Sequence, residues 1–199
     1  MYASYFFSLA TAVRLMSESV DESTFRAAMR RVPSPVVVIT APDPSSDAPG
    51  RGITIGSFSS VALDPPLISF NVARDASMHD IMQTCSRYAI HVLGERQAHL
   101  ATRFAEPGCT GAEQFEDVPH RVNDHGIPVL RDASLVLQCV PHESVAVADK
   151  TVFFGRVVQI AEEADDGAVL YYERSYRSVG RELPSSLLSP VKRASNDSS

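Results

Sequence analysis

Residues 51–72 read RGITIGSFSSVALDPPLISFNV, and this stretch decides the fold because two strand-like runs flank a loop of small hydroxylated residues. Ile53 and Ile55 alternate with smaller or polar residues, which is the period of a half-buried strand. The prolines at 65–66 end this unit, since proline lacks an amide donor, and residues 67–72 begin a second run. The stretch therefore predicts a strand, a loop whose hydroxyls and amides can donate to carbonyl or phosphate oxygens, a proline turn and a strand.

Length and composition indicate a single globular domain without a nucleic-acid surface. The chain has 199 residues, of which 44% are hydrophobic, and a formal charge of −6. Such a length is enough to bury a core, and the acidic balance offers no basic block to neutralise a phosphate backbone. An anionic cofactor would need a local positive site. The three cysteines are odd in number and far apart, which argues against a disulfide framework or a metal site.

The two ends of the chain differ from its middle. Residues 1–20 are predicted to be an extension that is apolar and aromatic at first but too short to span a bilayer, and residues 181–199 a disordered tail rich in serine. The domain is expected to cover residues 21–180, in a cytoplasmic protein with no membrane partner. An organellar address in the extension is the alternative, and its lack of several arginines counts against it.

The hydrophobic pattern predicts more strands than helices. A helix capped by Ser23 and ending at Pro33 would carry one apolar face through Phe25, Ala28, Met29 and Val32. A second helix begins at Ser77, a third carries residues 100–104 inward, and residues 105–128 are predicted to be loop. Strands are predicted at 36–40, 51–57, 67–73, 87–93, 135–140 and 151–158. This order favours a mainly β or α+β fold, a barrel-like antiparallel sheet with short helices.

One place in the sequence suits an anion. Arg74 and Ser77 lie just after a strand and at a helix start, where free amides and the helix dipole favour negative charge. With the serines at 57–60 they can converge on one phosphate, although an isolated surface arginine remains the alternative. His79 follows in the same helix, as a ligand contact or a solvated residue. The glycines at 50–56 lack the spacing of a dinucleotide fingerprint, and no serine-hydrolase or zinc-protease motif occurs.

The chain resembles the flavin reductase-like domain family in an ordered series of segments. These are PSPVVVIT (33–40), the stretch 51–72, RDASMHDI (74–81), SRYAIHVL (86–93), GIPVL (126–130) and DKTVFFGRV (149–157). The run SFSSVALDPP carries most of the likeness. The resemblance implies a split β-barrel with Greek-key-like antiparallel strands, in a homodimer that binds FMN or FAD near its interface. It also implies NADH or NADPH as co-substrate and a monooxygenase component as the partner that uses the reduced flavin.

The resemblance also implies which residues bind the cofactor. Residues 34–36 would border the isoalloxazine ring, residues 54–60 would serve its polar edge and phosphate arm, and residues 74–78 would hold phosphate, while Phe104 would lie near the cofactor's tail. No side chain is expected to be strictly catalytic, because the flavin carries the chemistry, and no metal ligand is expected. The full set is Ser34, Pro35, Val36, Thr54, Ile55, Gly56, Ser57, Phe58, Ser59, Ser60, Arg74, Ser77, Met78, His79, Phe104 and Lys150.

Two positions depart from the family's pattern. Pro35 stands where many relatives have glycine, so one backbone donor to the flavin is lost. Lys150 stands where many reductases have a histidine near the nicotinamide, and it either meets a nucleotide phosphate, which would favour NADPH, or is a solvated lysine. The leading hypothesis is hydride transfer from a nicotinamide to flavin. The alternatives are a non-catalytic FMN-binding electron carrier and a dimeric barrel that binds no flavin.

Overall fold

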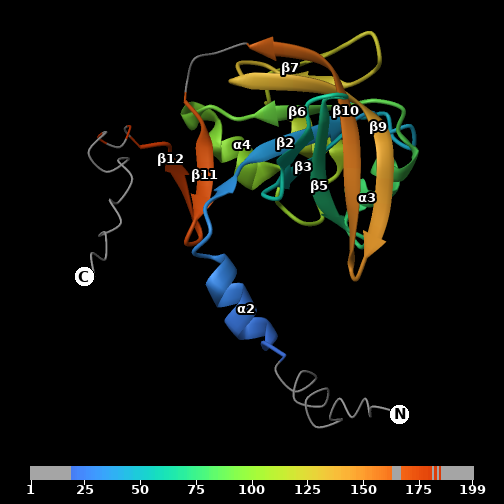
Figure 1. Ribbon diagram of the computed structural model, residues 1–199. Coiled ribbons are helices and arrows are strands. Elements are labelled where there is room, and N and C mark those ends of the chain that lie inside the picture. The colour runs from blue at the N-terminus through green and yellow to red at the C-terminus, as the bar shows by residue number, and fades with distance from the viewer. Residues whose placement is uncertain (1–18, 163–166, 181, 183, 185–199) are drawn as a thin grey trace, which may run out of the picture.

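The computed structural model describes residues 19–162 and 167–180 together with residues 182 and 184. Its main element is a seven-stranded antiparallel sheet that curls into an open barrel (Figure 1). In hydrogen-bonded order its strands are β3 (Arg51–Ile55), β2 (Val37–Ala41), β6 (Tyr88–Val92), β9 (Leu135–Val147), β10 (Lys150–Glu162), β5 (Leu67–Ala73) and β4 (Ser59–Ala62). The predicted mainly β, split-barrel fold is confirmed.

Residues 51–72 span the split in the barrel. Strands β3 and β4 follow one another in the chain, yet they are the two outer strands of the seven-stranded sheet. Only residues 56–58 join them, so this short bend crosses from one edge of the sheet to the other. Ser59 and Ser60, predicted to belong to the loop, instead begin β4, where Ser59 pairs with Ser69 of β5.

Helices and two small sheets surround the barrel. A three-stranded sheet contains β1 (Ser34–Pro35), β11 (Val169–Tyr172) and β12 (Ser175–Ser178), and a two-stranded one contains β7 (His120–Val122) and β8 (Pro128–Leu130). The helical segments are α2 (Glu22–Met29), α3 (Ser77–Thr84), η1 (Glu95–Gln97), α4 (Ala98–Arg103) and α5 (Gly111–Phe115).

The barrel interior is aromatic, and a buried polar side chain lies on the opposite face of the sheet. Phe70 contacts both Tyr88 and Phe153, with ring centroids 5.7 Å apart in each pair. His91 is fully buried between β2 and β8, where its Nδ1 lies 3.1 Å from the Val38 carbonyl oxygen and its Nε2 accepts from the Leu130 amide at 3.1 Å. Both nitrogens are therefore satisfied by a neutral ring, and burial lowers the pKa of His91 to about 4.

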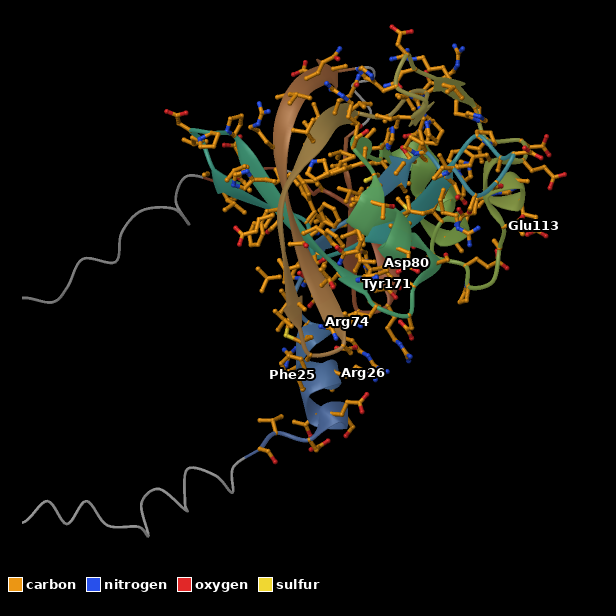
Figure 2. All side chains as sticks on the ribbon, turned by 90° about the vertical axis from the view of Figure 1, so that its right-hand side faces the viewer. Phe25, Arg26, Arg74, Asp80, Glu113 and Tyr171 are labelled. Carbon is orange, nitrogen blue, oxygen red and sulfur yellow. The ribbon has the colours of Figure 1, made fainter. Side chains whose placement is uncertain are left out.

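Helix α2 forms as predicted, but its cap and its surroundings differ. The N-cap is Asp21 rather than Ser23, because the Asp21 carboxylate accepts from the Thr24 amide at 3.0 Å and satisfies an otherwise free donor. No residue of α2 is buried, and Phe25 is 60% exposed. In both views the helix extends below the barrel, away from the sheets (Figures 1 and 2).

Several predicted boundaries were wrong. Residues 105–128 are not all loop, because Thr110 and Glu113 form a capping box that starts α5, and β7 follows. Strands β9 and β10 run well past the predicted ends because they form one long hairpin, whose bulges accommodate Pro141 and polar residues. Strands β11 and β12 were not predicted. The predicted extension, apart from residues 19–20, and most of the predicted disordered tail lie outside the described residues.

Candidate functional site

A cavity of about 480 Å³ opens where β3, the start of α3 and the segment after α4 meet. This size is in the range of small-molecule sites. Four of the sequence-predicted residues line it, namely Thr54, Ser77, Met78 and Phe104. The remaining lining residues are Arg51, Gly52, Ile53, Asp75, Ala76, Ala105, Glu106, Pro107, Gly108, Cys109 and Gln114.

Strand β3 is held firmly on the cavity side. The buried Gln114 side chain accepts from the Gly52 amide and donates to the Gly52 carbonyl, both at 3.1 Å. A Cβ atom on Gly52 would lie 2.5 Å from the Phe104 ring, so only glycine allows this close approach. The edge strand therefore finds a side-chain partner in place of a neighbouring strand, and the Phe104 ring closes the floor of the cavity.

The Thr54 hydroxyl donates a hydrogen bond within the fold. Its Oγ1 donates to the Ala101 carbonyl at 2.7 Å, and its amide donates to the Phe104 carbonyl at 3.1 Å. These bonds attach α4 to β3. The predicted donor to the flavin is thus a residue that positions the cavity wall, with its Oγ1 lone pairs left to accept.

The start of α3 presents free amides to the cavity. Ala76 is the N-cap and supplies no side-chain acceptor, so the amides of Ser77 and Met78 lack an intrahelical partner. Met78 is buried in the main core, which fixes the position of this first turn. The helix begins at Ser77 as predicted, and the helix dipole adds partial positive charge there.

Arg74, His79 and Lys150 do not line this cavity. Lys150 Nζ lies 2.8 Å from the Asp149 carboxylate, and its hydrogen bond, together with its positive charge, holds the pKa of that carboxyl below its ordinary value. The Arg74 amide donates to the Asp149 carbonyl at 3.0 Å, which keeps the two cations at one corner. His79 Nε2 lies 2.9 Å from Thr151 Oγ1, at the start of β10.

The predicted ring-binding residues form a second group around the bend. An ideal Cβ on Gly56 would lie 3.6 Å from the Ser34 Cβ, so β1 and the end of β3 are adjacent. Ser57 Oγ accepts from the Asn71 amide at 2.9 Å, which fixes the bend against β5. Phe58 and Ser60 face another cavity of about 450 Å³ between β4 and β10. The structure thus brings Ser34, Pro35 and Gly56 together, and the Asn71 contact places the bend beside β5, the strand that leads to Arg74.

Sequence reasoning missed Arg51, Gln114 and the segment 105–109. Arg51 Nε is buried and has no hydrogen-bond partner, a state shared among the described residues only by Tyr88 Oη. One signal was present for Arg51, since it is the only cation in the predicted strand that leads into the hydroxyl-rich loop. Residues 105–109 carry no periodic pattern, so only the fold reveals that they close the cavity.

Comparison with known proteins agrees with this architecture. Residues 29–180 match the family model described as flavin reductase like domain. An NADH:FMN oxidoreductase of Rhodococcus qingshengii is 37% identical over 166 residues, covering 81% of this chain and 83% of that protein. A flavin reductase of Pseudomonas putida is 28% identical over 165 residues, covering 83% and 94% of the two chains.

A solved structure extends the likeness to three dimensions. The NADH:FAD oxidoreductase SgcE6 of Streptomyces globisporus superposes with a TM-score of 0.73 at 27% identity, over 84% of this chain and 95% of that one. The same oxidoreductase has also been solved in complex with NAD and FAD fragments. With the family model covering most of its length, this chain belongs to the flavin reductase-like domain family.

Proposed function

We propose that this protein is an NADH-dependent flavin reductase that transfers hydride from the nicotinamide to FMN or FAD. The observation that carries the proposal is the family match over residues 29–180, which includes every segment that lines the cavity. Relatives named NADH:FMN oxidoreductase and NADH:riboflavin 5'-phosphate oxidoreductase are 37% and 34% identical to this chain. Two relatives therefore take the mononucleotide, while the structural neighbour from Streptomyces globisporus is named for FAD.

The residues present fit a flavin nucleotide. The uncapped start of α3 offers two amides to a phosphate, and the Arg51 guanidinium carries a buried donor without an acceptor. Bound flavin supplies the hydride-accepting chemistry. The chain's own residues bind and orient it: the amides of Ser77 and Met78 hold the phosphate, and residues 34–36 and 54–60 border the ring.

The environment of the ring follows from the backbone near Ser34. Pro35 has no amide hydrogen, so the donors to the ring's polar edge come from the bend at 56–58. The hydrogen bond from the Asn71 amide to Ser57 Oγ holds this bend in place. Donors fixed in this way stabilise negative charge on a bound ring without reorganising during the reaction. No proton donor of the chain is required.

We also propose a homodimer in which α2 of each copy covers the other. Phe25, Met29 and Val32 are about half exposed or more and lie on one side of α2 or just after it. The cavity between β4 and β10 is lined largely by aliphatic side chains, with Leu63 92% and Ile160 62% exposed. Two apolar surfaces on one chain that do not meet each other can pair reciprocally between two copies. Phe58 lines that second cavity, so the partner would lie beside the proposed ring site.

The remaining partners follow from the proposed activity. Reduced flavin would serve a monooxygenase component, as in the two-component tryptophan halogenase whose flavin reductase is 26% identical to this chain.

No helix among the described residues is long and apolar enough to cross a membrane. The three cysteines are free, which fits the cytoplasm as the proposed compartment. We propose the span 21–180 as the functional domain.

Anaerobic oxidation of NADH with added FMN or FAD tests the function. Loss of the flavin's visible absorbance should be much faster with the protein than without it, and NADPH should be compared under the same conditions. Flavin that stays bound through gel filtration but is not reduced by either nucleotide would contradict the proposal and identify an electron carrier. A protein that neither reduces nor retains flavin would leave only the flavin-free barrel.

A further inference from the structure

We propose that Arg51 binds the second phosphate of FAD and thereby selects FAD over FMN. This inference rests on the proposed function, and it names a residue outside the segments 34–36, 54–60 and 74–78, to which the resemblance assigns the cofactor. Three features of the cavity support it: the state of the Arg51 side chain, its distance from the ring end of the site, and the unused volume beyond α3.

The Arg51 guanidinium lacks a protein partner among the described residues, and a ligand could supply one. Its Nε is buried and makes no hydrogen bond, and within the described part of the chain Arg51 forms no ion pair. The Arg51 charge contributes to the lowered pKa of the Glu113 carboxyl. However, Glu113 Oε2 already accepts from the Thr110 amide at 2.7 Å and from the Thr110 hydroxyl at 2.8 Å. A buried arginine donor without an acceptor is costly, and a phosphate oxygen is its best partner.

The backbone fixes where this guanidinium lies. Arg51 pairs with Ala41 in the sheet, and its neighbour Gly52 is held at both its amide and its carbonyl by Gln114. A Cβ atom on Gly50 would meet the Ala41 carbonyl oxygen at 2.4 Å, so the chain before Arg51 is tightly packed as well. The cation is therefore placed before any ligand arrives, which lowers the entropic cost of binding.

Position along β3 separates Arg51 from the proposed ring end. Gly56 lies beside Ser34 at that end, and five residues of extended chain put Arg51 about 17 Å away. Arg51 lines the same cavity as Ser77 and Met78, whose amides face the proposed first phosphate. Arg51 can therefore meet the part of a dinucleotide that continues past its first phosphate.

The cavity has room for that continuation. It extends from α3 past Arg51 to residues 105–109 and holds about 480 Å³, far more than one phosphate fills. Asp75 and Glu106 also line it and oppose an anion. Both are exposed, so solvent weakens their effect relative to the buried guanidinium atom, and their oxygens can accept from ribose hydroxyls.

The test compares the affinities of the two flavins. Kd for FMN and for FAD is measured by flavin fluorescence with the full chain, with Arg51→Ala and with Arg51→Lys. The control is Arg87→Ala, which removes a half-buried arginine that lines none of the described cavities. We expect the ratio of the FAD to the FMN Kd to rise at least about tenfold in Arg51→Ala, the loss typical of one charged hydrogen bond. It should rise less in Arg51→Lys, which keeps the charge, and stay within about twofold in the control.

Three outcomes overturn the proposal. Both Kd values stay the same in Arg51→Ala, both rise by the same factor, or KM for NADH with FMN as acceptor rises in place of the FAD Kd, which would assign Arg51 to the nicotinamide nucleotide. Thermal unfolding of each variant shows that it is folded. A wild-type protein that binds both flavins but does not oxidise NADH would sink the proposed activity, while the ratio of the two Kd values would still decide the role of Arg51.

Discussion

The two edges of the seven-stranded sheet are built for different contacts. At the β3 edge, Gln114 satisfies the free backbone of Gly52, and the cavity contains the Arg51 guanidinium, whose Nε is buried. At the β4 edge, the surface is aliphatic, with Leu63 and Ile160 largely exposed. Polar groups fixed in a cavity suit a small charged ligand, whereas an exposed apolar surface suits another protein. One short bend joins the edges, so ligand and partner would meet at residues 56–58.

Both edges depend on the sheet that joins them, and the buried His91 of β6 gives the largest expected effect there. Its folded pKa is about 4, against an ordinary value of 6.5, because burial disfavours the charged ring. Between these values the unfolded chain binds more protons, so the free energy of unfolding rises with pH. The contribution is complete above about pH 6.5 and falls as pH drops towards 4, by on the order of 3 kcal/mol.

Urea unfolding at several pH values checks this. His91→Gln should be less stable at neutral pH, and its free energy of unfolding should depend less on pH between 4 and 6.5 than that of the wild type. His125→Gln, at an exposed position, is the matched control and should keep the wild-type slope. An unchanged slope in His91→Gln would mean that another group is responsible for the acid sensitivity.

The sequence predicted these two edges unequally, for physical reasons. Period-two alternation predicted β3 and β5, and helical spacing predicted α3 with Ser77 at its start. It did not predict that β3 and β4 lie at opposite edges, because pairing partners are set by long-range contacts. Arg51 is a site candidate only in the folded chain, where Gln114 fixes its neighbour Gly52. Gln114 lies sixty-two residues after Gly52 in the sequence. Likewise, the apolar stripe of α2 indicated a buried face, but no residue in the described part of the chain buries it.

A substitution at Gly52 tests the packing of the β3 edge against the Phe104 ring. In Gly52→Ala the new methyl group would lie 2.5 Å from the Phe104 ring, so β3 or the ring must shift. We expect a loss of about 1–3 kcal/mol in the free energy of unfolding, together with weaker flavin binding. Gly108→Ala is the control for the cavity, because nothing lies within 4 Å of its added Cβ, although its positive φ adds some strain. Equal flavin Kd values in Gly52→Ala and wild type would show that the floor of the cavity does not shape the site.

The β4 edge can be tested through the oligomeric state. Phe25→Asp puts a charge on the exposed stripe of α2 and should weaken the proposed dimer by about 2 kcal/mol, as loss of a central apolar contact does. Light scattering after gel filtration, over a range of protein concentrations, measures the shift towards monomer. Arg26→Asp changes the neighbouring exposed position and should have a smaller effect. A wild-type protein that is monomeric at all concentrations would contradict the proposed pairing.

Leu63→Asp tests the same contact from the other side. This side chain is 92% exposed in the single chain, so the substitution should not affect folding of the monomer. If α2 of one copy rests on the surface between β4 and β10 of the other, Leu63→Asp should weaken the dimer as Phe25→Asp does. A dimer sensitive to Phe25 but not to Leu63 would keep the role of α2 and move its contact elsewhere.

The turn at Asp149 and Lys150, between β9 and β10, gives the smallest expected effect. Lys150 is 47% exposed and already paired with Asp149, so its charge is partly neutralised before any nucleotide binds. Exposed ion pairs contribute little, and we expect Lys150→Ala to raise KM for NADPH by no more than about threefold while changing KM for NADH less. Steady-state oxidation of both nucleotides with saturating flavin measures this, with Asp149→Asn as the matched variant that frees the lysine and should lower KM for NADPH. If both variants leave both KM values unchanged, Lys150 is a solvated turn residue, and discrimination between the nucleotides must come from the cavity at the β3 edge.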